Sequence, residues 1–181
     1  MIKVNAWLLL TYKVPPEPSK NRIALWRKLK ALGAVYLQNS ICLLPKTTEH
    51  IRQLKLIEND IARIKGESVL LETVGLDKTQ EQKVVSRFKA DRDEEYKEFL
   101  GKCADFDAEI KKETKAKHFT YAELEENDVD LKKLQTWFDK IKKLDFYGAA
   151  LAVTAGHKLM ECQVILDEYA RKVYNAHEEN Q

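Results

Sequence analysis

The sequence has little of what several classes of protein require. It contains no run of about twenty uncharged apolar residues, the length that a helix needs to cross a membrane. Its first residues, Met1–Asn5, do not form a charged leader followed by a long apolar stretch, which is the pattern of a secretion signal. We therefore expect no membrane span and a cytoplasmic location.

Cysteine is scarce and unevenly placed. Cys42, Cys103 and Cys162 are an odd number, lie far apart and form no CxxC pair, which argues against both a disulfide framework and a structural zinc site. The four histidines are scattered as well. We expect reduced thiols, no metal site and no cofactor.

The common catalytic motifs are missing. The sequence holds no GxSxG, no phosphate-binding P-loop, no GxGxxG and no HExxH. We predict that the protein is not an enzyme and assign no catalytic residue.

Charge is unevenly distributed although the net charge is only +2. Residues 1–75 contain 12 Lys and Arg against 6 Asp and Glu, a net charge of +6, whereas residues 76–181 contain 19 against 23, a net charge of −4. A basic half favours contact with phosphate or another anion. The alternative is a solubilising surface with a local bias.

The first 75 residues alternate strand and helix patterns. Apolar runs rich in β-branched and aromatic residues indicate strands, and apolar residues spaced by three and four between Ser or Thr and Gly indicate helices. The expected elements are a strand over 3–14, a helix over 19–33, a hairpin of 34–38 and 41–44 around Asn39-Ser40, a helix from Thr47 or Thr48 to Gly66, and a strand over 68–74. This order, βαββαβ, predicts an α+β fold with a ferredoxin-like unit over 1–75.

The first helix has an apolar pattern that we interpret as its sheet-facing side. Ile23, Trp26, Leu29 and Leu32 recur every three residues, and at 100° per residue Leu25 gathers on the same side. Ser19 is a plausible N-cap.

The remaining residues, 76–181, are predicted to form a charged helical region that packs against the open face of the sheet. We expect a long helix from Thr79 to Lys115, or two helices with a break near Gly101. Thr120 is expected to cap a short turn. Further helices are predicted from Asp128 to Leu144 and over 149–176.

Positive side chains of the first helix form the main candidate site for DNA or another anion. At 100° per residue, Lys20, Arg27 and Lys28 lie opposite the apolar side, with Lys13 and Lys30 flanking them. The alternative is an ordinary solvated helix face.

A second candidate lies on the long helix. Arg87 and Arg92 could present guanidinium groups to an oxyanion. They could equally form helix-surface ion pairs with Asp91 and Glu95.

Several segments along the whole chain resemble the N-terminal domain of the ChrB family, regulators associated with bacterial chromate resistance. These segments are Trp7–Lys13, Pro15–Ser19, Trp26–Leu29, Leu32–Asn39, Leu43–Pro45, Arg87-Phe88, Arg92-Asp93, Glu95-Tyr96, Phe119–Leu124 and Asp145–Ala149. The resemblance implies a non-enzymatic, DNA-binding transcriptional regulator or accessory module of a chromate-resistance system.

Other readings stay open. Complete regulators of that family continue into a C-terminal domain to which the chromate response is attributed, so the chain could instead be a protein-interaction module for a separately encoded sensor. An enzyme acting on chromate is a further alternative. The predicted unit over 1–75 also resembles small CRISPR-associated nucleases, in which a metal-binding Asp follows a Tyr at the end of the first strand. In this sequence Lys13 follows Tyr12, so the metal-binding residue is missing. The outer strands of the sheet could also pair in a homodimer.

Overall fold

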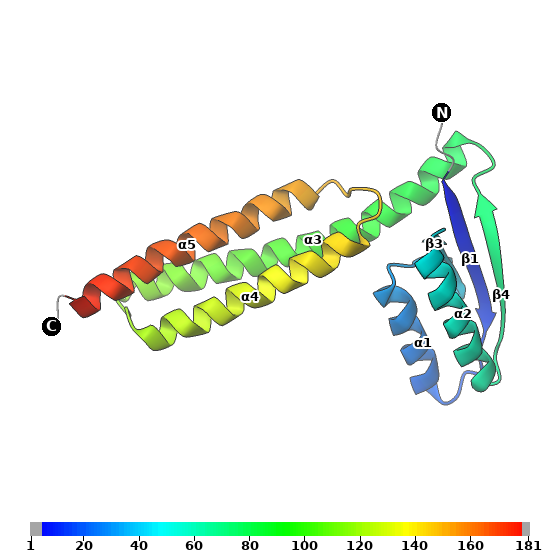
Figure 1. Cartoon of the computed structure of the whole chain (residues 1–181), viewed down its shortest axis with the longest axis horizontal. Coiled ribbons are helices and arrows are strands. Elements are labelled where there is room, and N and C mark those ends of the chain that lie inside the picture. Colours follow the sequence, from blue (N-terminus) through cyan, green and yellow to red (C-terminus); the bar gives the residue numbers. More distant parts are fainter. Residues whose placement is uncertain (1–4, 179–181) are drawn as a thin grey trace. The chain divides into compact units, whose positions relative to one another are not determined.

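The computed structural model describes residues 5–178, and Figure 1 shows the course of the chain. The chain divides into two compact units between Asp91 and Arg92. We call them the sheet unit and the helical unit. The division falls within helix α3 (Lys78–Lys115), so the first turns of α3 belong to the sheet unit and the rest to the helical unit.

The sheet unit alternates strands and helices in the predicted order. Its elements before α3 are β1 (Ala6–Lys13), α1 (Ser19–Ala31), β2 (Val35–Gln38), β3 (Ile41–Pro45), α2 (Thr48–Arg63) and β4 (Glu67–Val74). The α+β class is therefore confirmed. The part of the first predicted strand before Asn5 lies outside the described residues.

The four strands form one antiparallel sheet in the order β2-β3-β1-β4. In the centre, Leu10 of β1 lies opposite Cys42 of β3 and Leu70 of β4. Buried apolar residues of β1, β3 and the two helices contribute to the core of this unit, among them Leu8, Leu10, Leu25, Leu29, Leu44, Leu54, Ile57 and Ile61. Burial of such side chains contributes about 1.5–3 kcal/mol each.

Local signals explain where most of these elements begin and end. The Thr47 hydroxyl accepts a hydrogen bond from the His50 amide at 3.0 Å and so caps α2 as predicted. Ser40 takes a φ of 63°, which closes the turn of the β2–β3 hairpin. The predicted cap at Ser19 is wrong. Pro18 holds the extended cap position, Ser19 is already helical, and no side chain caps α1.

The helical unit contains the later turns of α3, α4 (Tyr121–Leu144) and α5 (Ala152–Glu178). Helix α4 begins at Tyr121 and not at Asp128, because the Thr120 hydroxyl accepts from the Glu123 amide at 3.2 Å and starts the helix there. The alternative of a break in α3 near Gly101 is wrong, since the helix runs through that residue.

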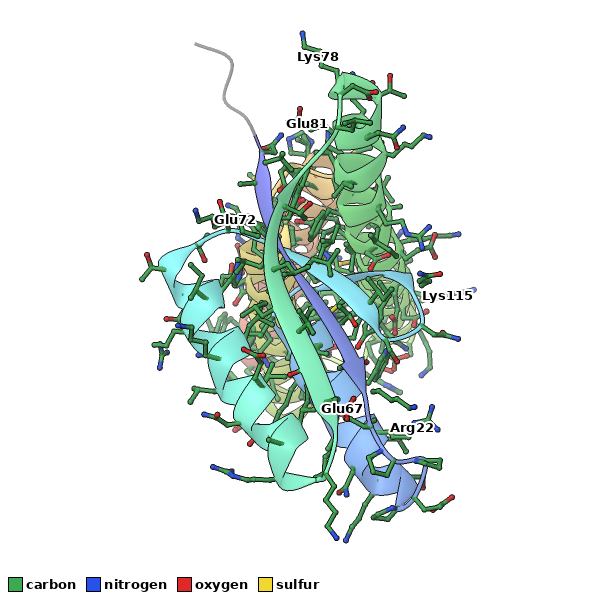
Figure 2. The ribbon with its side chains drawn as sticks, turned by 90° about the vertical axis from the view of Figure 1, so that its right-hand side faces the viewer. Arg22, Glu67, Glu72, Lys78, Glu81 and Lys115 are labelled. Atoms are coloured by element: carbon green, nitrogen blue, oxygen red, sulfur yellow. The ribbon has the colours of Figure 1, made fainter. Side chains whose placement is uncertain are left out.

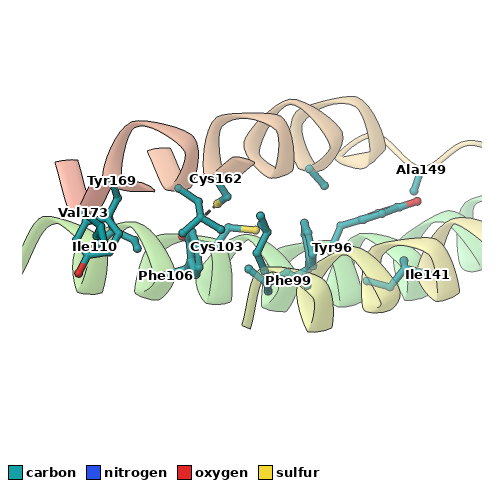
Figure 3. Close-up of a cluster of buried hydrophobic side chains, with 14 residues drawn as sticks. Tyr96, Phe99, Cys103, Phe106, Ile110, Ile141, Ala149, Cys162, Tyr169 and Val173 are labelled. Atoms are coloured by element: carbon teal, nitrogen blue, oxygen red, sulfur yellow. Dashed lines mark hydrogen bonds between the residues drawn. The ribbon is translucent and has the colours of Figure 1, made fainter. Parts of the chain in front are cut away.

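One apolar core holds the three helices together (Figure 3). Its buried residues are Tyr96, Phe99, Cys103, Phe106, Ile110, Leu131, Leu134, Ile141, Ala149, Ala155, Cys162, Leu166, Tyr169 and Val173. Phe99 packs edge-on against Trp137, with ring centroids 5.6 Å apart. No helix within residues 5–178 is both long enough and apolar enough to span a bilayer.

Candidate functional site

A groove of about 1040 Å³ opens on the sheet unit. The end of β1, helix α1, the β2–β3 hairpin and the first turns of α3 line it. Its lining contains four positively charged residues, Lys13, Arg22, Lys30 and Arg87, against the single carboxylate of Asp91. The excess of positive charge suits the groove to an anion.

Helix α1 supplies one wall of the groove, since one side of the helix is buried in the core and the neighbouring side faces the groove. Leu25 and Leu29 point into the core with exposed fractions of 5% and 0%. Arg22, Trp26 and Lys30 follow the same spacing on a neighbouring side, and all three line the groove.

The interpretation of Ile23 and Trp26 as sheet-facing residues is therefore wrong. Ile23 is 46% exposed and Trp26 is 50% exposed, and both line the groove. The core needs one narrow stripe of α1, which Leu25 and Leu29 already provide. An indole that is half exposed beside positive charges offers a flat face on which a base or another planar group can stack.

Two tyrosines connect β1 and β2 at the groove. The hydroxyls of Tyr12 and Tyr36 lie 2.8 Å apart in a hydrogen bond in which either can donate. Burial raises the pKa of Tyr12. It also raises the pKa of Tyr36, which the bond to Tyr12 raises further. Both phenols are thus neutral and able to donate a hydrogen bond at physiological pH.

The positive residues of the groove are held in different ways. Lys30 pairs with Asp91 at 3.0 Å, which joins α1 to α3. Arg87 donates to the backbone carbonyls of Tyr36 at 2.9 Å and Leu37 at 3.2 Å. Because carbonyl groups carry no net charge, Arg87 keeps its positive charge available to the groove.

Among the residues that the structure describes, the other two cations of the groove, Lys13 and Arg22, have no such charged partner. Within residues 5–178, Lys13 and Arg22 form no ion pair. Lys13 is exposed at the end of β1, and Arg22 is exposed on the first turn of α1. They are the groove side chains best placed to neutralise an incoming phosphate.

The other predicted anion-binding residues of α1 lie outside the groove lining. Lys20 and Arg27, seven residues apart, are exposed on another side of the helix. Lys28 pairs with Asp60 of α2 at 2.6 Å. Of the five predicted residues, Lys20 and Arg27 therefore face outward and Lys28 faces α2. Only Lys13 and Lys30 line the groove.

The two arginines of the second candidate cluster have different partners. Arg87 lines the groove of the sheet unit, as described above. Arg92 begins the helical unit, is 2% exposed and pairs with Glu95 at 3.2 Å. This burial leaves little of the guanidinium accessible to an oxyanion in solution.

Two acidic residues near Arg92 stabilise the connection between α4 and α5. Asp93 accepts from the Leu151 amide at 2.8 Å, and Asp145 accepts from the Ala149 amide at 2.9 Å. The Tyr96 hydroxyl also donates to Asp145 at 3.3 Å, and burial followed by the Asp145 charge raises the pKa of Tyr96 to about 12. These residues therefore fix the loop, and we assign them no binding role.

Sequence reasoning missed Arg22, Trp26, Tyr12 and Tyr36 as groove residues. A usable signal was present for the first two, since Arg22 and Trp26 share a four-residue spacing with Lys30. No sequence signal linked Tyr12 to Tyr36, because the contact depends on strand pairing. Within the described part of the chain, no three His, Cys, Asp or Glu residues are grouped to hold a metal ion.

These features define an α+β protein with a cationic, aromatic groove on a sheet unit and a separate helical unit with a filled core. The sequence matches the family described as "Protein ChrB, N-terminal" over residues 22–180. The chain belongs to this family.

A curated relative supports the assignment. The chain is 34% identical over 96 residues to Protein ChrB of Cupriavidus metallidurans. The match covers 53% of this chain and 29% of the relative, so the chain corresponds to only part of that protein. Comparison with solved structures gives no match, and the ferredoxin-like assignment stays a prediction.

Proposed function

We propose that the chain is a non-enzymatic, DNA-binding regulator or accessory module of a chromate-resistance system, and that the groove of the sheet unit contacts the phosphate backbone. Membership of the ChrB N-terminal family supports the link to chromate resistance. The cytoplasm is the compartment in which such a regulator meets DNA.

The observation that carries the proposal is the composition of the groove. Four positive side chains and one carboxylate line the groove, and Trp26, which lines it as well, is half exposed. Side chains of this kind bind phosphates through charge and stack on bases through the indole. Binding led by phosphate contacts depends strongly on salt and only weakly on base sequence.

The burial of the thiols, and the protonation of Cys42 in particular, favours a regulator over an enzyme that reduces chromate. Cys42, Cys103 and Cys162 are all buried and free. Burial raises the pKa of Cys42 to about 12, so this thiol is protonated at physiological pH. A protonated, buried thiol is a poor nucleophile.

A protein partner is the second candidate. Ile23 and Trp26 expose apolar surface at the groove, and a half-exposed tryptophan is typical of residues that anchor protein interfaces. A separately encoded sensor domain is the partner that this alternative proposes. It predicts binding with little dependence on salt.

The test compares two charge-matched variants in a fluorescence-anisotropy titration with the DNA upstream of the gene for this chain. Lys13→Gln with Arg22→Gln removes two groove cations. Lys140→Gln with Lys143→Gln removes two exposed cations of the helical unit. We expect the groove variant to lower the slope of log K against log salt by about 1 for each side chain.

The control variant is expected to bind with the affinity and the salt slope of the unmodified protein. Equal losses in both variants would show that net charge alone drives binding. If the groove variant binds as tightly as the unmodified protein, the groove is not the DNA-contacting surface.

A further inference from the structure

The two edges of the sheet differ in how open they are. Edge strand β2 is short and carries a register irregularity between Tyr36 and Gln38. Arg87 also donates to two backbone carbonyls of this strand. A bulge and occupied carbonyls are means by which proteins block pairing with another strand.

Edge strand β4 (Glu67–Val74) lacks these protections. It pairs with β1 in regular register along all of its 8 residues, and no other strand within residues 5–178 pairs with its outer edge. It contains neither proline nor lysine. Figure 2 looks onto this edge, with Glu67 and Glu72 marking the strand. Such an edge offers a row of unpaired N–H and C=O groups.

Two apolar side chains of β4 are exposed on one face of the sheet. Val69 is 52% exposed and Leu71 is 51% exposed. Side chains alternate along a strand, so the two share a face, and Ser68 points to the opposite face, where it donates to Glu58 of α2 at 3.2 Å. The β4 edge therefore combines open backbone groups with an apolar pair that α2 does not cover.

We propose that β4 pairs antiparallel with β4 of a second copy of this chain across a two-fold axis. Such pairing continues the antiparallel order of the sheet. Outward-pointing backbone groups occur at alternate residues, so a two-fold pairing is centred on a single residue. The choice of that residue decides which side chains meet.

Centring on Leu70 gives the most favourable contacts. Val69 then lies opposite Leu71 of the second copy, and the symmetry repeats this apolar pair. Glu72 lies opposite Ser68, and no two carboxylates face each other directly.

The two neighbouring registers bring less favourable pairs of side chains together. Centring on Leu71 places Glu72 opposite Leu70, and centring on Val69 places Glu67 opposite Leu71. Each of these sets a carboxylate against an apolar side chain, and each replaces the two contacts between Val69 and Leu71 with a single self-pair, Leu71 with Leu71 or Val69 with Val69. The sequence of β4 thus selects one register, as a specific pairing requires.

This pairing goes beyond the proposed function and does not depend on it. A dimer formed in this way leaves the β2 edge and the groove of each copy outside the strand-to-strand contact, because β2 and β4 are opposite edges of the sheet.

Sedimentation equilibrium of the full chain tests the proposal. We expect a monomer–dimer equilibrium, and Val69→Lys with Leu71→Lys should weaken the dimer by about tenfold or more, because the apolar pairs become like-charge pairs. The matched control is Val153→Lys with Val164→Lys on α5, where both residues are exposed. A chain that stays monomeric at every concentration, or equal weakening by both variants, overturns the proposal.

Cysteine cross-linking tests the register in a way that does not depend on charge. Val69→Cys mixed with Leu71→Cys is expected to form a disulfide-linked dimer under mild oxidation, whereas each variant alone should form little. The unmodified chain, whose three cysteines are buried, gives the background. Efficient cross-linking of either single variant, or none in the mixture, contradicts the register centred on Leu70.

Discussion

The sheet unit and the helical unit use charge differently. Three ion pairs of the sheet unit join separate segments, namely Lys28 to Asp60, Lys30 to Asp91 and Lys46 to Glu72. Most ion pairs of the helical unit lie within one helix, between residues three or four apart. There the helices are held together by the apolar core.

This difference helps to explain how the groove of the sheet unit forms. In the sheet unit, α1 and α3 approach through the Lys30–Asp91 pair, and charged residues remain along the space between these helices and the hairpin. The predictions below test this comparison.

The largest effect is expected in the core of the helical unit. Phe99 is 0% exposed and contacts both Trp137 and Phe138. Phe99→Ala should lower the free energy of unfolding by about 3–5 kcal/mol, measured by urea denaturation. The control is Met160→Ala, at a residue that is 68% exposed. A loss below about 1 kcal/mol would contradict the central role of the apolar core.

A smaller effect is expected at the connection between α4 and α5. Asp145→Ala removes the acceptor of the Ala149 amide and of the Tyr96 hydroxyl. We expect a loss of about 1–2 kcal/mol in the same denaturation experiment. Asp139→Ala, at an exposed residue of α4, should change stability little. Equal effects of the two variants would contradict the role of Asp145 in fixing this loop.

The link between α1 and α2 should contribute less again. Lys28 and Asp60 are partly exposed, with side-chain exposures of 57% and 32%, so solvent weakens their attraction. A double-mutant cycle of Lys28→Ala and Asp60→Ala should give a coupling energy below about 1 kcal/mol that falls as salt is added. A coupling that is unchanged by salt would argue against an exposed pair.

The smallest effect concerns Glu49, which pairs within α2. Its carboxylate accepts two bonds from Arg52 and one from Gln53, and the bonds from Arg52 make the largest contribution in lowering its pKa from 4.5 to about 2. Stability from this group is present above pH 4.5 and is lost as the pH falls towards 2. Carbon-detected NMR titration of the carboxylate checks the value. A measured pKa near 4.5 would show that the bonds do not persist in solution.

The order of elements in the sheet unit could be predicted because its signals are local. Apolar runs between Pro, Gly and Thr mark the strands and helices, and Thr47 caps α2 as its position suggests. The groove could not be predicted in the same way. Ile23 and Trp26 form an apolar stripe as convincing as that of Leu25 and Leu29, and only packing against the sheet decides which one is buried.

The partners of the charged residues also could not be predicted from spacing along the sequence. The sequence places Asp91 one turn after Arg87, yet Asp91 pairs with Lys30 of α1. Arg87 instead meets the carbonyls of the β2 edge. Such contacts depend on how the elements pack, and spacing along one helix carries no information about them.

The three tryptophans provide the most direct test of the groove as the DNA-contacting surface. Trp26 lines the groove, Trp7 is buried in the sheet unit, and Trp137 packs in the helical unit. In proton–nitrogen NMR spectra, adding a short DNA duplex should shift the indole signal of Trp26 and leave that of Trp137 in place. A shift confined to Trp137, or bound DNA with an unchanged Trp26 signal, would contradict the account.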